Sequence, residues 1–294
     1  MKIGIIGLGR MGFGMAERLH QNNMEVVGYN RSPAKTDALK EKGIEVAYEI
    51  EELLSKLTPE KKIVWLMLPT GGPTEDMIKL LLGKLNPGDI IINGANSFYK
   101  DAEEQATWCK EKDVHLFDCG VSGGVWGLEN GYTLMIGGDK EEFHYIEPFC
   151  KALAPEKGYG FFGEVGKGFY VKSVHNIVEY VYLQGLAEGV ELLEKRDIDI
   201  AKATEVWGPA SVVKSWLLDL TTKALRRDDF DEIAPKIGSV TIKELKDTKE
   251  SVEGYAPAFD VSTQIREDNS DKFTLGKRTI AAVRNEFGGH AVEK

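Results

Sequence analysis

The chain has 294 residues, of which 42% are hydrophobic and 29% charged, and its formal net charge is −10. This composition is typical of a globular protein with one large or two ordinary cores. The acidity excludes binding to nucleic acid or to an anionic membrane through a general positive field. An anionic ligand must therefore be bound by a local basic pocket.

Cysteine usage and hydropathy suggest the compartment. Cys109, Cys119 and Cys150 form no C-x-x-C pair and no metal-ligand spacing, so we interpret them as free thiols in a reducing environment. The N-terminus lacks the features of a secretory signal. No apolar run approaches the about 20 residues of a membrane span. We expect a cytoplasmic protein.

Up to about residue 118, short β-rich runs alternate with amphipathic helical stretches. Strands are predicted at 2–6, 25–29, 62–68, 89–93 and 114–118. Helices are predicted between them at 11–21, 32–42, 72–85 and 101–112. Near-continuous apolar strands that alternate with helices indicate a parallel sheet covered on both faces.

The pattern changes in the second half of the chain. After the glycine-dense stretch at 119–138, one more helix and strand end near Phe162. From about Gly166 onward only helical periods remain, with caps such as Asp197, Asp199 and Ser211. We therefore predict an α/β domain over residues 1–165 and an all-α domain over residues 166–294.

The first predicted strand runs directly into GLGRMG, which places Gly7, Gly9 and Gly12 in G-x-G-x-x-G register. With a strand before it and a helix after it, this pattern is typical of a Rossmann-like dinucleotide site. Gly7 permits the tight turn, Gly9 lets the backbone approach a pyrophosphate, and Gly12 lets the helix pack on the strand. The helix N-terminus then offers N–H groups to that pyrophosphate.

The end of the second strand indicates which nucleotide binds. An NAD site usually has an Asp or Glu there for the ribose hydroxyls, but this chain has Tyr29 and Asn30, followed by Arg31, Ser32 and Lys35. A guanidinium and a hydroxyl hold a 2′-phosphate that a carboxylate would repel. We predict NADP. NAD, with Arg31 as a solvated surface residue, is the alternative.

The segment VKSVHNIVEY places Lys172, His175, Asn176 and Glu179 on one face of a helix. Apolar residues cover nearly every other direction, which predicts a buried helix. Buried ionisable groups must be paired or used. Burial lowers a lysine pKa and raises a carboxyl pKa, so this face suits a base and an acid. The alternative is the solvated side of an amphipathic helix.

GLGRMG, the NRS after the second strand, WLMLPTG, NGANS, CGVSGG with WGLENGYTLMIGG, KSVHNIVEY and RNEFGGH together resemble decarboxylating 6-phosphogluconate dehydrogenases. The length resembles their short-chain bacterial branch. The β-hydroxyacid dehydrogenases share the N-terminal motifs and a catalytic lysine, whereas Lys-x-x-His-Asn followed by Glu179-Tyr180 is more particular to the phosphogluconate enzymes.

The resemblance implies a role for each matching residue. Lys172 would deprotonate the substrate C3 hydroxyl, and Glu179 would protonate C1 after carbon dioxide leaves. Substrate contacts would come from Asn96, Ser122, Gly123, Gly124, His175, Asn176, Tyr180, Arg266, Arg284 and His290. Cofactor contacts are expected from Gly7, Gly9, Arg10, Met11, Gly12, Asn30, Arg31, Ser32, Leu68, Pro69 and Asn96. The family uses no metal.

The same resemblance implies an assembly. In the family a C-terminal arginine and histidine, matched here by Arg284 and His290, reach the substrate phosphate from a partner subunit. We therefore expect a homodimer or homotetramer in which the C-terminal segment completes the neighbouring active site, with a small sugar acid as the ligand.

Three departures concern the grip on the substrate's tail. Ile177 stands where the family usually has glycine, and Gly208-Pro209 stand where an arginine-containing pair is common. Residues 246–259 keep nothing of a glycine-rich phosphate-binding stretch beyond Lys249 as a possible substitute. The substrate is then 6-phosphogluconate held by rearranged residues, or an analogue with another end group such as a sulfonate.

Two other functions compete with this one. A β-hydroxyacid dehydrogenase without decarboxylation would need no second acid, so Glu179 argues against it. A non-catalytic nucleotide-sensing protein would keep the glycine loop only, and would have no use for Lys172 and Glu179 on one face.

Overall fold

A computed structural model describes residues 1–237, 239–268 and 270–294. The chain divides into two compact units, Met1–Lys172 and Ser173–Lys294. The division falls within a long helix, α8 (Lys167–Glu194), rather than ahead of it at residue 165. Among the described residues, no helix combines the length and apolarity needed to cross a bilayer.

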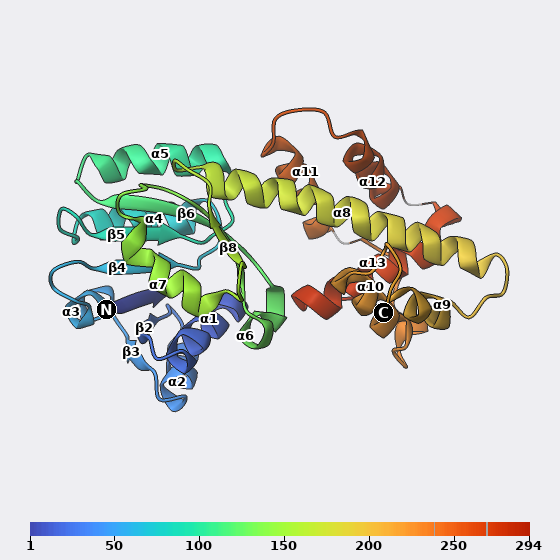
Figure 1. The fold of residues 1–294 in the computed structure, drawn as a ribbon, viewed down its shortest axis with the longest axis horizontal. Helices are drawn as coiled ribbons and strands as arrows, with labels where there is room; N and C mark the ends of the chain where they lie inside the picture. The colour runs from blue at the N-terminus through green and yellow to red at the C-terminus, as the bar shows by residue number, and fades with distance from the viewer. Residues whose placement is uncertain (238, 269) are drawn as a thin grey trace. The chain divides into compact units, whose positions relative to one another are not determined.

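The first unit is built on one sheet with the strand order β3-β2-β1-β4-β5-β6-β7-β8 (Figure 1). Its described strands are β1 (Lys2–Ile6), β2 (Glu25–Tyr29), β3 (Glu45–Ala47), β4 (Ile63–Leu66), β5 (Ile90–Asn93), β6 (His115–Ser122), β7 (Thr133–Gly137) and β8 (Tyr159–Phe161). The expectation of a parallel sheet is correct for every pair except β6 and β7, which are antiparallel.

Seven α-helices described before α8 complete this unit. They are α1 (Arg10–Gln21), α2 (Pro33–Glu41), α3 (Ile50–Lys56), α4 (Gly72–Leu82), α5 (Tyr99–Lys110), α6 (Gly127–Asn130) and α7 (Phe143–Leu153). Alternate residues of one strand enter different cores: Ile63 and Trp65 of β4 lie in one, Val64 and Leu66 in the other. Since side chains alternate across a strand, the sheet is covered on both faces.

The regular elements described in the second unit are all helices. It contains most of α8, then α9 (Ile200–Trp207), α10 (Trp216–Leu225), α11 (Ser239–Glu250), α12 (Pro257–Glu267) and α13 (Thr274–Gly288). Leu183 of α8 shares a core with Leu220 of α10 and Val283 of α13. Tyr180, Leu245 and Phe259 form a separate small core that joins α8, α11 and α12.

Helix caps in this unit agree only partly with the sequence. Asp199 caps α9, because its carboxylate accepts a hydrogen bond of 2.9 Å from the backbone N–H of Lys202. Ser215, not Ser211, caps α10 by accepting from the N–H of Leu218. The Ser211 hydroxyl instead donates to the carbonyl of Trp207, so that prediction was wrong.

Candidate active site

The glycine loop between β1 and α1 has the backbone shape that the motif requires. Gly7 has φ of 100°, and a Cβ there would lie 2.4 Å from the carbonyl oxygen of Met67. A Cβ on Gly12 would lie 2.0 Å from the carbonyl oxygen of Gly7. Gly9 is the N-cap of α1 and provides no side-chain cap, and a Cβ there would meet nothing within 4 Å. This open space before a helix N-terminus fits a pyrophosphate.

The residues after β2 contact the glycine loop and place the cation Arg31 beside it. The Asn30 side-chain oxygen accepts a hydrogen bond of 2.9 Å from the N–H of Leu8, which ties the glycine loop to β2. Arg31 and Ser32 follow and are exposed. The residues present therefore fit the adenosine ribose of a nicotinamide dinucleotide. Leu68 is partly buried and Pro69 is exposed, just beyond the end of β4.

The predicted substrate-binding residues of the first unit lie at the carboxyl ends of β5 and β6, where ligands bind in open α/β sheets. Asn96 has φ of 51°, and its side-chain amide bonds to the backbone of Val121 in both directions, at 2.9 and 3.2 Å. It thereby pins the loop after β5 to β6, immediately before Ser122. Gly123 and Gly124 follow with φ of 121° and 56°.

Lys172 lies in the first turns of α8 and is only 8% exposed. A Cβ on Gly120 of β6 would lie 2.4 Å from the Cβ of Lys172, so the helix and the strand are in direct contact there. The helix start is held by Asp118 of the same strand, whose carboxylate accepts from the N–H groups of Gly166 and Phe169 at 2.8 and 2.7 Å.

The Asp118 carboxylate is fully buried. Burial raises the pKa of this carboxyl to about 6, although hydrogen bonds from the backbone N–H groups of Phe169, Gly166 and Gly168 oppose that rise. Above this pH the group is a carboxylate, which is the better acceptor for helix N–H groups and complements the positive end of the helix dipole.

The other members of the predicted face follow along α8. The His175 Nδ1 lies 3.3 Å from the Asn176 side-chain oxygen and 3.9 Å from a Glu179 carboxylate oxygen. The Glu179 side chain is 20% exposed. The expectation that apolar residues bury this helix all round was wrong for Val174 and Val178, which are 41% and 62% exposed because the described part of the chain leaves that side uncovered.

Two arginines converge on Tyr180, the residue after Glu179. The guanidinium carbons of Arg266 and Arg284 each lie 5.4 Å from the centre of its ring. All three side chains are at least 96% buried. Arg266 donates from one Nη to the carbonyl of Tyr180 at 2.8 Å, while its Nε and other Nη have no hydrogen-bond partner.

Two positive charges lie close together in this cluster. Burial, together with the positive charge of Arg284, lowers the pKa of the Arg266 guanidinium to about 10, while Tyr180 and Glu179 act in the opposite sense. A buried guanidinium that has spare donors and a like-charged neighbour is suited to bind an anion. The structure thus brings Tyr180, Arg266 and Arg284 together within a single chain.

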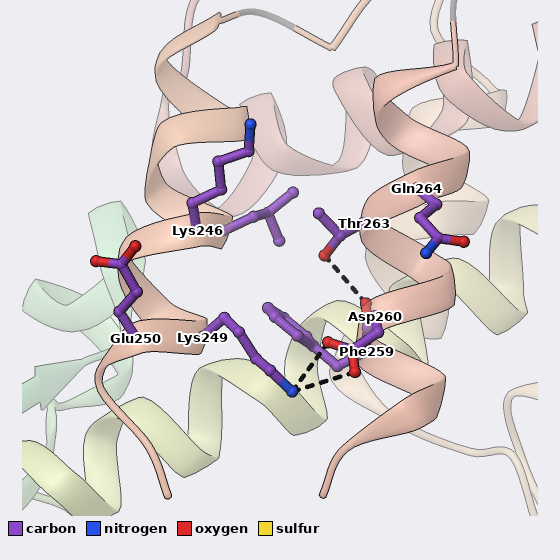
Figure 2. A pocket seen from close by; sticks show the side chains of 8 residues that line it. Lys246, Lys249, Glu250, Phe259, Asp260, Thr263 and Gln264 are labelled. Atoms are coloured by element: carbon purple, nitrogen blue, oxygen red, sulfur yellow. Dashed lines mark hydrogen bonds and ion pairs between the residues drawn. The ribbon is translucent and has the colours of Figure 1, made fainter.

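Two further residues discussed with the resemblance are Lys249 and His290. Lys249 lines a groove of about 410 Å³ between α11 and α12, and it pairs across that groove with Asp260 at 2.9 Å (Figure 2). Its charge is therefore already matched. His290 lies at the end of α13, where its ring contacts that of Phe287 and its carbonyl accepts a hydrogen bond from Asn285.

Asp118 was not predicted from the sequence as a residue connected to the site. An acid at the end of a predicted strand gives no signal by itself, because sequence spacing does not show that its partners lie 48 and 51 residues later. The glycines at 120, 137 and 168 were a usable signal, since a strand or helix glycine often marks close backbone approach. Among the described residues, no group of three or more His, Cys, Asp or Glu side chains is placed to hold a metal ion.

Comparisons with known proteins identify the family. Residues 2–163 match the family model described as the NAD binding domain of 6-phosphogluconate dehydrogenase. YqeC of Bacillus subtilis, named only provisionally as a 6-phosphogluconate dehydrogenase, is 37% identical over the full length of both chains. A Haloferax volcanii protein named as an NAD(+)-dependent, decarboxylating 6-phosphogluconate dehydrogenase is 36% identical over 79% of this chain and 77% of its own.

A solved structure shares the fold. The 6-phosphogluconate dehydrogenase of Plasmodium falciparum superposes with a TM-score of 0.77 over 97% of this chain and 69% of its own, at 24% identity.

Proposed function

Because the chain belongs to the 6-phosphogluconate dehydrogenase family of oxidoreductases, we propose that it catalyses the NADP-dependent oxidative decarboxylation of 6-phosphogluconate or a close six-carbon aldonate. The observation that carries this proposal is the pair of buried arginines around Tyr180, which directly follows the acid Glu179. They supply the local positive charge that an acidic protein needs for an anionic substrate.

Helix α8 orders the chemistry along its axis. Lys172 and Glu179 are seven residues apart on it, a rise of about 10 Å, and Tyr180 follows. Lys172 and Glu179 both serve the C1–C3 end of the substrate, while the arginines beside Tyr180 hold its anionic tail. NADP, when bound, supplies the nicotinamide carbon that accepts a hydride from C3.

The side chains of this protein handle the protons. Lys172 takes the proton of the C3 hydroxyl, so that the C3 carbonyl forms as the hydride departs. The resulting β-keto acid loses its C1 carboxylate as carbon dioxide and leaves an enediol. Glu179 donates a proton to C1, which yields a ketopentose. His175, within 3.9 Å of the Glu179 carboxylate, orients that acid and the substrate hydroxyls.

The arginine pair favours a phosphate tail over a sulfonate. A phosphate monoester carries about −1.5 to −2 charges at neutral pH, which matches two guanidinium groups better than the single charge of a sulfonate. Lys249 adds no third cation, since it is paired with Asp260. Among substrates with a phosphate, a sulfonate or a plain hydroxyl at the tail, we favour 6-phosphogluconate.

The test follows NADPH absorbance and carbon dioxide release together, with NADP and 6-phosphogluconate supplied. Equal molar amounts of both products are expected. NADPH without carbon dioxide would show a simple β-hydroxyacid dehydrogenase. A higher kcat/KM for a 6-sulfonate or for gluconate than for 6-phosphogluconate would contradict the tail assignment.

A further inference from the structure

We propose that Asp118 and Gly120 of strand β6 are positioning residues for Lys172, because together they fix where the first turns of α8 lie against the sheet. The proposal rests on the role proposed above for Lys172 as the base. Neither residue need touch substrate or cofactor.

Asp118 fixes the helix along and around its axis. The first N–H groups of a helix have no partner within it. Those of Gly166 and Phe169 each donate to a different oxygen of the Asp118 carboxylate, at 2.8 and 2.7 Å. Two bonds to amides three residues apart restrict both sliding and rotation of the helix. Lys172 follows Phe169 by three residues, close to one turn, and therefore lies above the same side of the helix.

Glycines at the contact, which have no Cβ, let α8 lie close to the sheet. A Cβ on Gly168 would lie 2.4 Å from the carbonyl oxygen of Met135, and a Cβ on Gly137 would lie 2.4 Å from a carboxylate oxygen of Asp118. A Cβ on Gly120 would lie 2.4 Å from the Cβ of Lys172 and 3.1 Å from its Cγ. The base of the lysine side chain therefore has no room to move toward β6.

This contact matters for proton transfer because lysine has a long, flexible side chain. A general base must come within hydrogen-bond distance of the proton that it removes. With the Cβ fixed against β6, the amine reaches a smaller volume. A displacement of about 1 Å at a reacting group lowers rates by about a hundredfold. The contact between the first turns of α8 and β6 is thus expected to control kcat rather than ligand affinity.

The first experiment compares Asp118→Asn with Asp89→Asn. Asp89 is a matched control, since it is also buried and accepts hydrogen bonds from two backbone N–H groups, those of Lys62 and Asn86. It lies just before the first residue of β5, whereas Asp118 pairs with the last residue of that strand. Asp118→Asn should lower kcat by about tenfold to a hundredfold with KM and the NADP dissociation constant close to wild type. Asp89→Asn should keep the wild-type kcat. Equal kcat losses in both variants would overturn the proposal.

The second experiment compares Gly120→Ala with Gly185→Ala, and it holds even if Asp118→Asn fails to fold. Gly185 lies on α8 itself, where a Cβ meets nothing within 4 Å. Gly120→Ala should lower kcat while NADP binding is kept, and Gly185→Ala should be neutral. A Gly120→Ala protein that is folded and has the wild-type kcat would contradict the assignment.

A third readout needs no turnover and separates this inference from the proposed reaction. The rate at which acetic anhydride modifies Lys172 is measured by mass spectrometry in each variant. Asp118→Asn and Gly120→Ala should raise the rate several-fold over wild type, and their controls should not. If the wild type fails to oxidise 6-phosphogluconate, the proposed function falls while this comparison still decides the positioning role. Unchanged labelling in both variants would refute it.

Discussion

At Arg266 a positive charge is held 97% out of contact with water, with two of its nitrogens unpartnered and a second arginine across the same ring. Such a group lowers the stability of the unliganded protein unless it is matched by charge. In the proposed function the substrate anion would supply that match. We therefore expect Arg266 to serve binding rather than folding.

Replacing Arg266 by Met should separate these two effects. The unliganded variant is expected to be as stable as the wild type or more stable, because a buried unmatched charge becomes an apolar chain. Its KM for 6-phosphogluconate should rise about tenfold to a hundredfold, the loss of one charge-assisted contact of about 1.5–3 kcal/mol. Thermal unfolding and steady-state kinetics measure both.

The control is Arg227→Met in the same unit. Arg227 is paired with Asp229 and Glu286, so its loss should lower stability without changing KM. A strongly destabilised Arg266→Met protein with normal KM would show that Arg266 serves the fold.

Arg31 is expected to decide between the two nicotinamide cofactors. Arg31→Ala should weaken NADP binding by about one to two decades, since one charge-assisted bond to the 2′-phosphate is lost. NAD binding should hardly change. Titration of each cofactor by fluorescence measures this, with Lys40→Ala on the exposed side of α2 as the control. Equal losses for both cofactors would argue against NADP.

Among the elements, strand β6 has the most consequences for the rest of the protein. Its Asp118 binds the first turn of α8, its Val121 bonds to Asn96, and it ends at Ser122. Its buried Asp118 also makes the stability of the protein depend on pH, because burial raises the pKa of this carboxyl from 3.8 to about 6.

The sign of this dependence follows from linkage. A raised pKa in the folded state means that the contribution of Asp118 is most favourable below pH 3.8 and is lost as pH rises through about 6. Between pH 5 and pH 7 the wild type should lose about 1 kcal/mol relative to Asp118→Asn. Denaturant unfolding of both proteins at each pH measures the difference, in which all other groups cancel. A constant difference would mean that the folded-state pKa is not raised.

The elements also show what sequence alone can predict. The glycine loop was predictable because G-x-G-x-x-G combines a residue pattern with a strand–helix context. The three-residue β3 and the strand β7 were missed, the first for its length and the second because it lies in a glycine-dense stretch. The convergence of Arg266 on Tyr180, 86 residues away, came only from the family resemblance, because spacing carries no information over such a distance.

At the scale of the whole molecule, the position of Arg284 bears on which chain completes each site. The resemblance implies that Arg284 comes from a partner subunit, yet here Arg284 contacts Tyr180 of its own chain. It belongs to α13, whose neighbouring residues Val283 and Ile280 lie in the core of the same unit. We expect the arginine pair to be complete within one chain.

Complementation tests this expectation. Lys172→Met should abolish turnover, and Arg284→Ala should raise KM about tenfold or more. The two variants are co-expressed with different tags, and mixed oligomers are purified through both. If each chain supplies its own Arg284, mixed oligomers should be no more active than Arg284→Ala at low substrate. Recovery toward half of the wild-type activity would show that the arginine acts across subunits.

The arginine pair at Tyr180 also affects the choice of assay medium. Inorganic phosphate and sulfate have the charge and geometry of a substrate's tail, so they should occupy the pair and act as competitive inhibitors. Initial rates in phosphate buffer would then understate the catalytic efficiency of this enzyme. A substrate screen run only in such a buffer would underestimate substrates with a phosphate tail relative to those without one.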